Sequence, residues 1–562
     1  MKPAWQSFLT ALVFGGALST SAGSNPIRLD TVGYLPELPK VASIAADCTN
    51  FQLIRVSDGK SIFAGEASGP VTNADSGEKL FSADFSACHE PGIFQLDVPG
   101  VGRSPRFEIG SGAFTNAYRT AMLGMYLWRC GTAVSATFGG KLFAHDACHT
   151  NDAWLELAGG EHSVRPSLGG WHDAGDYNKY VVNAGVSVGV MLRAWEDFGG
   201  ALEKVKLQLP PGDEGIPDFL REVKWELDWL LTMQAPDGSV YHKVSTRDFG
   251  AFIMPEEETA PRYFVPWGSA ATADFVAMMA MAARDYEKYD LAFAARCLQA
   301  AQKSYQFLAE NPMNHPADQS EFSTGTYAVR DRDARLWAAA ELWETTGDAG
   351  CLRDYEERAK KSGGELDASW DYGNVKNLGE LTYLFSTRGG RDTNLLTTLQ
   401  TSLLKTADAI VAKAAAHGYA RPLGIKYSWG GNGTVARQVV VLHAAEKISP
   451  KPAYRATAMD AVNYLLGRNS FGRSFVTGIG FEPPLHPHDR FSAALDLDVP
   501  CPGHLVGGPQ PGALDWQDLQ QDYTRNEIAI NWNTALIYAL AEFLPGKITA
   551  ATAPAKIAAN QK

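Results

Sequence analysis

The spacing of hydrophobic residues changes once along this chain, at Ala113. From Ile27 to about Gly110, short runs rich in β-branched and aromatic residues, such as FQLIRVS and GIFQLDV, are separated by turn residues. Runs of this kind are typical of strands joined by tight turns. The pattern predicts about seven strands in an antiparallel β-sandwich of immunoglobulin type over residues 25–110.

Beyond Ala113, apolar residues recur every three or four positions, as in IPDFLREVKWELDWLLTMQ and PAYRATAMDAVNYLLGR. This spacing is typical of helices that bury one face. About twelve such segments follow one another as far as Leu544, which predicts an all-α domain over residues 113–545. Helices in that number favour six hairpins closed into a barrel, although a helical solenoid would show the same periodicity.

The two ends of the chain differ from the rest. Residues 1–22 contain an early cation, an apolar run and small residues before Ala22, which predicts a signal peptide cleaved after Ala22. The run is too short to span a bilayer, and no cysteine follows it to carry a lipid. Residues 546–562 have too few large apolar side chains to pack and are predicted to be disordered. We therefore expect a protein exported to the periplasm or the medium.

Composition excludes several partners. The 562 residues are 45% hydrophobic and 20% charged, a balance that supports a large core. The net charge of -13 and the absence of a Lys- or Arg-rich block argue against nucleic acid and anionic membrane surfaces. We expect a neutral substrate and a monomeric protein. Seven cysteines are few for this length; Cys48 and Cys88 are either one disulfide or two thiols.

Three loops between the predicted helices carry acids, His or Arg beside aromatic residues. GGWHDAGDYNKY contains Asp173 and Asp176, PPLHPHDR contains His488 and Arg490, and DWQDLQQDYTRNE ends at Glu527. A single acid before a helix is usually a cap. A pair of acids in one loop and a lone acid in another match what hydrolysis of a glycosidic bond requires. Aromatic residues nearby suit the apolar faces of sugar rings.

These motifs resemble glycoside hydrolase family 9, in the branch with an immunoglobulin-like domain before an (α/α)6 barrel. IRLDTVGYLPELPK resembles the start of that N-terminal domain, and GGWHDAGDYNKYVV resembles the family's DAGD segment. The most specific motif runs from Trp516 to Thr534 and includes Asp518, Tyr523 and Glu527. It matches the family's C-terminal signature at every fixed position.

The resemblance implies an inverting hydrolase of β-1,4-glucosidic bonds in cellulose or soluble β-glucans, most simply an endoglucanase. Asp176 would be the general base that activates water, Asp173 would help to hold that water, and Glu527 would be the general acid. Such a reaction requires roughly 6.5–9.5 Å between the base and acid carboxylates. Glu527 must then stay protonated near neutral pH, most simply through partial burial.

The same resemblance assigns substrate binding to His488, Arg490, Asp518 and Tyr523. The histidine signature departs from the family pattern at Glu482 and Asp489, where this chain has acids. Extra acids could favour short chain ends or amino sugars. The alternative function is therefore an exo-acting enzyme of the cellobiohydrolase, glucosidase or glucosaminidase type.

Cys130, Cys148, His149 and His172 form a separate group of candidate ligands. Two thiolates and two imidazoles would complete a tetrahedral structural zinc site, and the resemblance points to these four residues. The alternative is a Cys130–Cys148 disulfide. Calcium is also implied, but its ligands are not assigned, because Arg221 stands where an acid is common.

Two hypotheses of other classes are weighed against the hydrolase. A non-catalytic carbohydrate-binding protein on the same scaffold would lack at least one catalytic acid, and none is missing. A zinc hydrolase would need an open coordination position, whereas the four candidate ligands fill a tetrahedral site.

Overall fold

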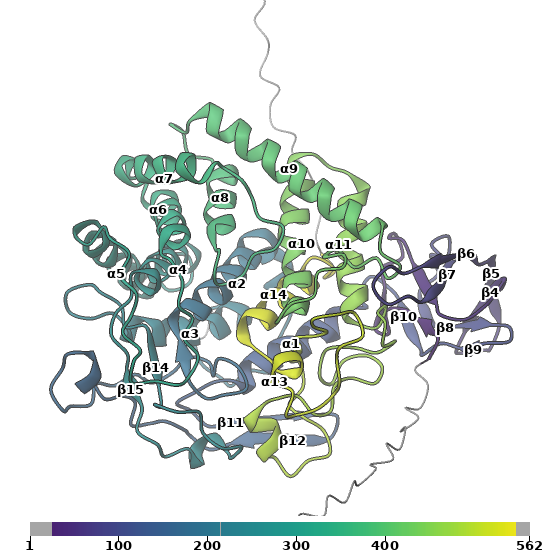
Figure 1. The fold of residues 1–562 in the computed structure, drawn as a ribbon, viewed down its shortest axis with the longest axis horizontal. Coiled ribbons are helices and arrows are strands. Elements are labelled where there is room, and N and C mark those ends of the chain that lie inside the picture. Colours follow the sequence, from purple (N-terminus) through teal and green to yellow (C-terminus); the bar gives the residue numbers. More distant parts are fainter. Residues whose placement is uncertain (1–24, 214, 547–562) are drawn as a thin grey trace, which may run out of the picture.

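The structure is a computed structural model and describes residues 25–213 and 215–546. A β-domain lies at one end of a larger helical domain (Figure 1). The predicted order of a β-sandwich followed by a helical barrel is confirmed. The predicted signal peptide, 1–22, and all of the predicted tail except Gly546 lie outside the described residues.

Two sheets form the β-domain. One has the order β1 (Ile27–Arg28), β3 (Val41–Ile44), β7 (Lys79–Asp84) and β6 (Ser68–Thr72). The other has the order β2 (Gly33–Tyr34), β10 (Phe107–Ile109), β8 (Gly92–Val98), β4 (Asn50–Arg55) and β5 (Ser61–Glu66), with β9 (Gly102–Arg103) beside β8.

Alternate residues of β4 and β8 point into the sandwich. Leu53 pairs with Leu96, and both are fully buried. Ten strands occur between Ile27 and Ile109 in the described chain, against about seven predicted. Three of them, β1, β2 and β9, have two residues each, too few to leave a periodic signal in the sequence.

Six helices form the inner wall of the helical domain. They are α2 (Val181–Leu202), α4 (Ser269–Tyr286), α6 (Arg332–Thr346), α8 (Lys376–Phe385), α10 (Gly431–Ile448) and α14 (Ile530–Ala541). All residues of α14, and nearly all of α4, are buried, as expected for helices with neighbours on every side.

Six further helices form the outer wall, namely α1 (Thr115–Leu127), α3 (Asp218–Thr232), α5 (Leu291–Glu310), α7 (Ala349–Ser362), α9 (Thr393–Ala415) and α11 (Pro452–Leu465). In α9 the buried residues form one stripe, which includes Leu395, Leu399 and Leu403. The last helix, α14, packs against both α10 and α2, so the ring returns to its start and the solenoid alternative is wrong. Across the described ranges, no helix has both the length and the apolar character that a membrane span requires.

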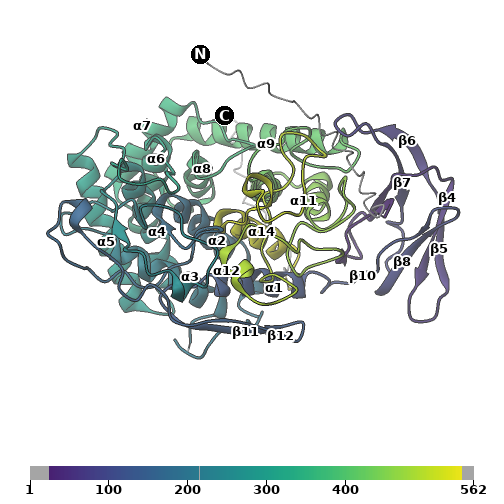
Figure 2. The same cartoon turned by 60° about the horizontal axis from the view of Figure 1, so that its bottom comes forward.

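Short elements lie in the loops at the ends of these helices. They are β11 (Val134–Phe138) and β12 (Lys141–His145), then β13 (Lys179–Tyr180), β14 (Lys243–Ser245) and β15 (Tyr263–Phe264), and the helices η1 (Glu156–Ala158), η2 (Pro255–Glu257), α12 (Arg490–Ala494) and α13 (Tyr523–Asn526). In Figure 2, α12 lies near α1, α2 and α14, although its residues are far from α1 and α2 in the sequence.

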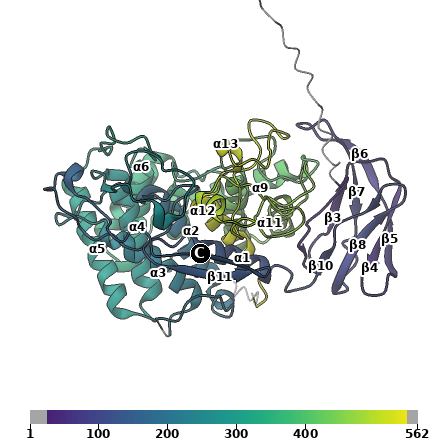
Figure 3. The ribbon, with the colours of Figure 1, turned by 90° about the horizontal axis from the view of Figure 1, so that it is seen from below.

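Both apolar and polar contacts join the two domains. Figure 3 shows the sandwich beside the α9 and α11 side of the barrel. Leu80 of β7 packs into the hydrophobic core of the helical domain, and Asp75 accepts hydrogen bonds from His417 (3.0 Å) and Tyr427 (2.5 Å). Burial acts to raise the pKa of Asp75, but these two hydrogen bonds and the His417 charge outweigh it and lower that pKa to about 2.

We predict that Asp75→Ala lowers the free energy of unfolding by about 2 kcal/mol, because His417 and Tyr427 would lose a shared charged acceptor at a buried contact. Thermal unfolding measured by circular dichroism checks this. The matched control is Asp47→Ala, which removes an exposed acid of the same domain and leaves stability unchanged. Equal melting temperatures for the two variants would contradict the importance of this contact.

Candidate active site

The main candidate site is a cavity of about 630 Å3 at one end of the barrel. Most of its lining residues lie in the loops that precede the inner helices α2, α6, α8, α10 and α14 or in the first turn of α14, whereas Phe249, His488 and Arg490 come from other segments. Helix N-termini carry partial positive charge, which favours carboxylates at this end. The lining residues are Asp173, Ala174, Asp176, Tyr180, Phe249, Gly325, Thr326, Tyr327, Asp371, Tyr372, Trp429, His488, Arg490, Tyr523, Glu527, Ala529, Asn531 and Trp532.

Asp173 and Asp176 differ in which of their carboxylate oxygens accept hydrogen bonds. Asp173 accepts from Asn183 Nδ2 on Oδ1 (2.8 Å) and from the Tyr327 hydroxyl on Oδ2 (2.6 Å). Asp176 accepts from Asn178 Nδ2 (2.7 Å) and the Tyr180 hydroxyl (2.9 Å), both on Oδ2. Its Oδ1 has no hydrogen-bond donor among the described residues. One carboxylate is therefore engaged at both oxygens, whereas the other keeps one oxygen available.

Burial, together with the nearby charge of Asp176, raises the pKa of Asp173 to about 8, against the hydrogen bonds from Tyr327 and Asn183. Two carboxylates this close do not both ionise readily. At neutral pH the pair therefore retains a proton and carries less than two full negative charges.

Glu527 approaches the same cavity from the loop before α14. Burial raises its pKa well above the usual range, and the charges of Asp176 and Asp173 act in the same direction. A carboxylic acid in this setting keeps its proton at neutral pH. It can then donate that proton to a bound group.

Gly175 brings the three loops of the site together. A Cβ at this position would overlap the carbonyl oxygen of His488. The Gly175 carbonyl accepts hydrogen bonds from the Arg490 backbone N–H (3.1 Å) and from Arg490 Nη1 (2.6 Å). The sequence requires glycine here because only its backbone fits between the two segments.

His488, Arg490 and Tyr523 all line the cavity, as the sequence predicts for substrate-binding candidates. The His488 ring contacts Phe252 on one side, with centroids 5.2 Å apart, and Tyr523 on the other, at 5.9 Å. Tyr523 in turn contacts Trp429 at 5.7 Å. Tyr523 and Trp429 are 50% and 51% exposed, so this row offers open ring faces at the mouth of the cavity.

Asp518, in contrast, is not among the residues that line the cavity. Its carboxylate accepts from the backbone N–H groups of Leu485 (2.7 Å) and His486 (2.9 Å) and from Asn526 Nδ2 (3.1 Å). It therefore fixes the His488 loop relative to the segment that precedes Glu527.

The two acids that suggested an exo-acting enzyme lie elsewhere as well. Asp489 is buried and caps α12, where it accepts from the backbone N–H groups of Phe491 and Ser492. Glu482 is exposed and does not line the cavity. Neither acid lines the cavity, so their positions give no support to the exo alternative.

Several lining residues carry no local signal in the sequence and were missed. Tyr327 has a left-handed backbone, with φ of 40°, and its ring contacts Tyr180 and Tyr372 at centroid distances of 4.9 and 4.8 Å. Asp371 accepts from Asn531 Nδ2 (2.7 Å) and pairs with the buried Arg437 (2.5 Å). The sequence offered one clue to such residues, namely the aromatic residues in the loops between helices. Aromatic residues are too common throughout this chain for that clue to be specific.

The four predicted metal ligands come together. Within residues 25–213 and 215–546, Cys130, Cys148, His149 and His172 form the one group of three or more His, Cys, Asp or Glu side chains that could bind a metal ion, and one ligand atom from each lies within 4.8 Å of the others. Cys130 Sγ is 3.5 Å from His149 Nδ1, and Cys148 Sγ is 3.7 Å from His172 Nε2. Such separations suit the edges of a tetrahedron with bonds of about 2.0–2.3 Å. The cysteines are unbonded thiols, as are Cys48 and Cys88.

This donor set fits a structural zinc ion. Burial lowers the pKa of His172 to about 4, so its imidazole is neutral, the form that binds metal. All four protein ligands would fill a tetrahedral site and leave no position for water. His172 directly precedes Asp173, so the cluster lies beside the acid pair.

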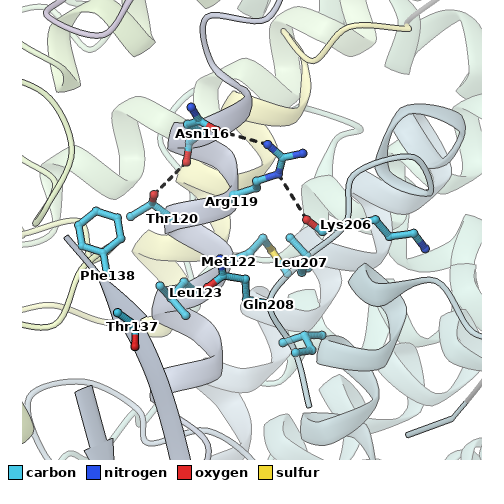
Figure 4. Close-up of a pocket in the computed structure, with 11 residues that line it drawn as sticks. Asn116, Arg119, Thr120, Met122, Leu123, Thr137, Phe138, Lys206, Leu207 and Gln208 are labelled. Atoms are coloured by element: carbon cyan, nitrogen blue, oxygen red, sulfur yellow. Dashed lines mark hydrogen bonds between the residues drawn. The ribbon is translucent and has the colours of Figure 1, made fainter. Parts of the chain in front are cut away.

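A second cavity, of about 550 Å3, lies between α1, the end of β11 and residues 206–209 (Figure 4). Arg119 points to Asn116 and to the Lys206 carbonyl, which accepts its Nε hydrogen bond at 3.3 Å. No carboxylate is among the residues that line this cavity. It lacks the acid and base that glycosidic hydrolysis needs.

Comparison with protein families gives two matches along the chain. Residues 22–103 match the cellulase N-terminal ig-like domain, and residues 114–540 match glycosyl hydrolase family 9. The second match spans most of the chain and includes every residue that lines the main cavity.

Individual relatives agree with these matches. The chain is 54% identical over 521 residues to Endoglucanase D of Acetivibrio thermocellus, which covers 92% of this chain and 83% of that protein. Among solved structures, a metagenome-derived glycoside hydrolase family 9 endoglucanase superposes with a TM-score of 0.86 at 33% identity, covering 92% of this chain and 98% of the other. A zinc-binding triple mutant of family 9 endoglucanase J30 gives 0.84 at 32% identity, with 91% and 99% covered. The chain therefore belongs to glycosyl hydrolase family 9, and it is a glycoside hydrolase with an immunoglobulin-like domain before its barrel.

Proposed function

We propose that this protein is an endo-acting β-1,4-glucanase that hydrolyses cellulose or related soluble β-glucans with inversion of configuration. One observation carries the proposal. A single cavity contains a carboxylate with one available oxygen, on Asp176, and a carboxylic acid with a strongly raised pKa, on Glu527. The 54% identity to a protein named Endoglucanase D supports the endo-acting assignment.

In the proposed reaction, Asp176 Oδ1 accepts a proton from a water molecule as the water oxygen attacks the anomeric carbon. Glu527 donates its proton to the glycosidic oxygen, and the bond between that oxygen and the anomeric carbon breaks. Attack on the face opposite to the leaving group inverts the configuration. The products are a new reducing end and a new non-reducing end. Asp176 has then gained a proton and Glu527 has lost one.

In this proposal Asp173 is a positioning residue. Its two oxygens are engaged by Asn183 and Tyr327, so it is fixed against α2 and the loop before α6. Its neighbouring negative charge, when present, favours retention of the proton on Glu527.

Arg490, His488 and Tyr523 are proposed to bind sugar, because all three line the cavity and the latter two present rings beside it. Exposed aromatic faces at a cavity mouth suit the apolar faces of pyranose rings. Asp518 is proposed to act indirectly, through the loop that carries His488.

Cys130, Cys148, His149 and His172 are proposed to bind one structural zinc ion. The ion would supply a cross-link between the segments that carry these residues, and it would take no part in the hydrolytic step. The proposal also includes export by the predicted signal peptide and action as a monomer.

We predict a rapid fall in viscosity when the protein acts on carboxymethylcellulose, with mixed oligosaccharides as products and the α-anomer formed first from cellohexaose. Proton NMR and viscometry check both statements. Glu527→Gln should lower kcat by about 10³-fold, since the leaving oxygen loses its proton donor. A single short product without a fall in viscosity would overturn endo action, and a β-anomer would overturn inversion.

We predict that Asp173→Asn moves the basic limb of the kcat/KM profile to lower pH. The charge of Asp173 raises the pKa of Glu527, and Glu527 acts in its protonated form. Removal of that charge lets Glu527 lose its proton at lower pH. Asp515→Asn, which changes an exposed acid in the same C-terminal region, is the control and should leave the limb in place. A limb that moves to higher pH in Asp173→Asn would contradict this assignment of charges.

We predict that removal of metal by a strong chelator lowers the melting temperature and that about one equivalent of Zn2+ restores it. Cys130→Ser should reduce the zinc content, whereas Cys297→Ser, at a buried cysteine outside the cluster, should not. Elemental analysis and calorimetry measure both quantities. A melting temperature that responds to reducing agents and not to chelators would favour the disulfide alternative.

A further inference from the structure

Residues 246–258 run between the metal cluster and the catalytic cavity. This segment, here called the strap, follows β14 and includes η2. Its side chains contribute little to the hydrophobic core, and Phe249 and Phe252 are 49% and 39% exposed. Its position is set mainly by polar contacts, and four of them connect it to the metal cluster and the cavity.

At its first end the strap contacts the residue that engages Asp176. The Thr246 backbone N–H donates to Asn178 Oδ1 at 2.9 Å. A backbone N–H can only donate, so the amide nitrogen of Asn178 must face the other way. That nitrogen donates to Asp176 Oδ2 at 2.7 Å. Movement of the strap at Thr246 would therefore reach Asp176 through one side chain.

The middle of the strap contacts Arg490. The Gly250 carbonyl accepts from Arg490 Nε at 3.0 Å. The guanidinium carbon lies 5.5 Å from the centroid of the Phe249 ring and 5.2 Å from that of Phe252, distances typical of cation–π contacts. The Ile253 carbonyl accepts from the Tyr177 hydroxyl at 2.6 Å. The strap and the Gly175 loop together fix the guanidinium.

The far end of the strap contacts the metal cluster. Glu258 Oε2 lies 3.2 Å from His149 Nε2, and both side chains are buried. The other ring nitrogen of His149, Nδ1, faces Cys130. A carboxylate on the second nitrogen of a metal-binding histidine fixes the orientation and tautomer of the ring.

Glu258 also closes the strap on itself. A Cβ at Gly250 would overlap Glu258 Oε1, so the second carboxylate oxygen lies directly against the Gly250 backbone. The path from the cluster to the substrate side is therefore short. It runs from His149 through Glu258 and Gly250 to Arg490, with contact at every step.

We infer that Glu258 is a positioning residue that couples metal binding at His149 to the placement of Arg490, through the strap. The inference rests on the proposed zinc site and on the proposed role of Arg490 in sugar binding. Metal in the cluster fixes His149, His149 fixes Glu258, and Glu258 fixes the backbone that accepts the Arg490 hydrogen bond. Zinc thereby affects substrate binding without contact with substrate.

The test compares the full-length protein with Glu258→Ala and Glu258→Gln, each loaded with zinc and each treated with a chelator. Glu257→Gln is the matched control, because Glu257 is exposed and lies next in the chain. Hydrogen exchange of peptides from 246–254 reports on the strap without any substrate. KM and kcat on cellohexaose report on Arg490.

We expect zinc-loaded Glu258→Ala to exchange its strap amides as fast as zinc-free wild type and to raise KM by about 10-fold, with kcat much less affected. Removal of zinc from Glu258→Ala should then add no further change, because the connecting side chain is already absent. Glu258→Gln retains the shape and one acceptor oxygen and should recover most of the wild-type KM.

Wild-type KM and strap exchange in zinc-loaded Glu258→Ala would overturn the inference, even if zinc binds more weakly. Additive effects of zinc removal and the substitution would also overturn it. If Glu258→Ala does not fold, Gly250→Ala provides the second variant, since its methyl group would displace Glu258 Oε1 and should raise KM while zinc stays bound. Failure of the proposed function would show separately, as wild type that hydrolyses no β-glucan while strap exchange still responds to zinc.

Discussion

The candidate active site depends on close backbone contact at Gly175. The Asp173–Asp176 loop, the His488–Arg490 segment and the loop before α14 come from distant parts of the chain, and they meet where a side chain would not fit. Two hydrogen bonds from Arg490 to one carbonyl oxygen fix the first two segments together. The Ile530 backbone N–H donates to the Asp173 carbonyl at 2.9 Å and joins the third. The relative positions of the proposed acid and base follow from these contacts.

This arrangement places several carboxyl groups close together, and the barrel offsets part of their repulsion. The carboxyl groups of Asp173, Asp176, Glu527 and Asp371 lie around one cavity, and burial and neighbouring negative charge oppose the ionisation of Asp173 and Glu527. The helix N-termini around the cavity and the buried guanidinium of Arg437 supply positive potential. The positive potential offsets the burial and repulsion only in part, so the pKa values of Asp173 and Glu527 remain raised. An unfavourable local environment is thus the source of the protonation states that the chemistry needs.

Much of the fold could be predicted from the sequence, because apolar periodicity reports which faces of an element are buried. Periodicity located the helices, and the closure of the ring became evident only when α14 was seen against α2 and α10. The proposed catalytic acids lie in motifs with fixed spacing, so the sequence alone could single them out as candidates. The sequence did not single out Tyr327, Asp371 and Trp429, because each belongs to a loop whose position is set by contacts with residues far away in the sequence. Asp489 illustrates the opposite error: an acid in a suggestive motif serves as a helix cap.

The site has a buried inner part and an exposed rim. This difference in burial bears on how such enzymes diversify. Asp173, Asp176 and the partners Asn178, Tyr180 and Asn183 are buried in the barrel, whereas Phe249, Trp429 and Tyr523 are about half exposed on separate loops. Loop residues that pack against few neighbours tolerate exchange at small cost in stability. Selection, natural or in the laboratory, can therefore change the choice of polysaccharide at the rim and leave the proposed acid and base beneath it intact.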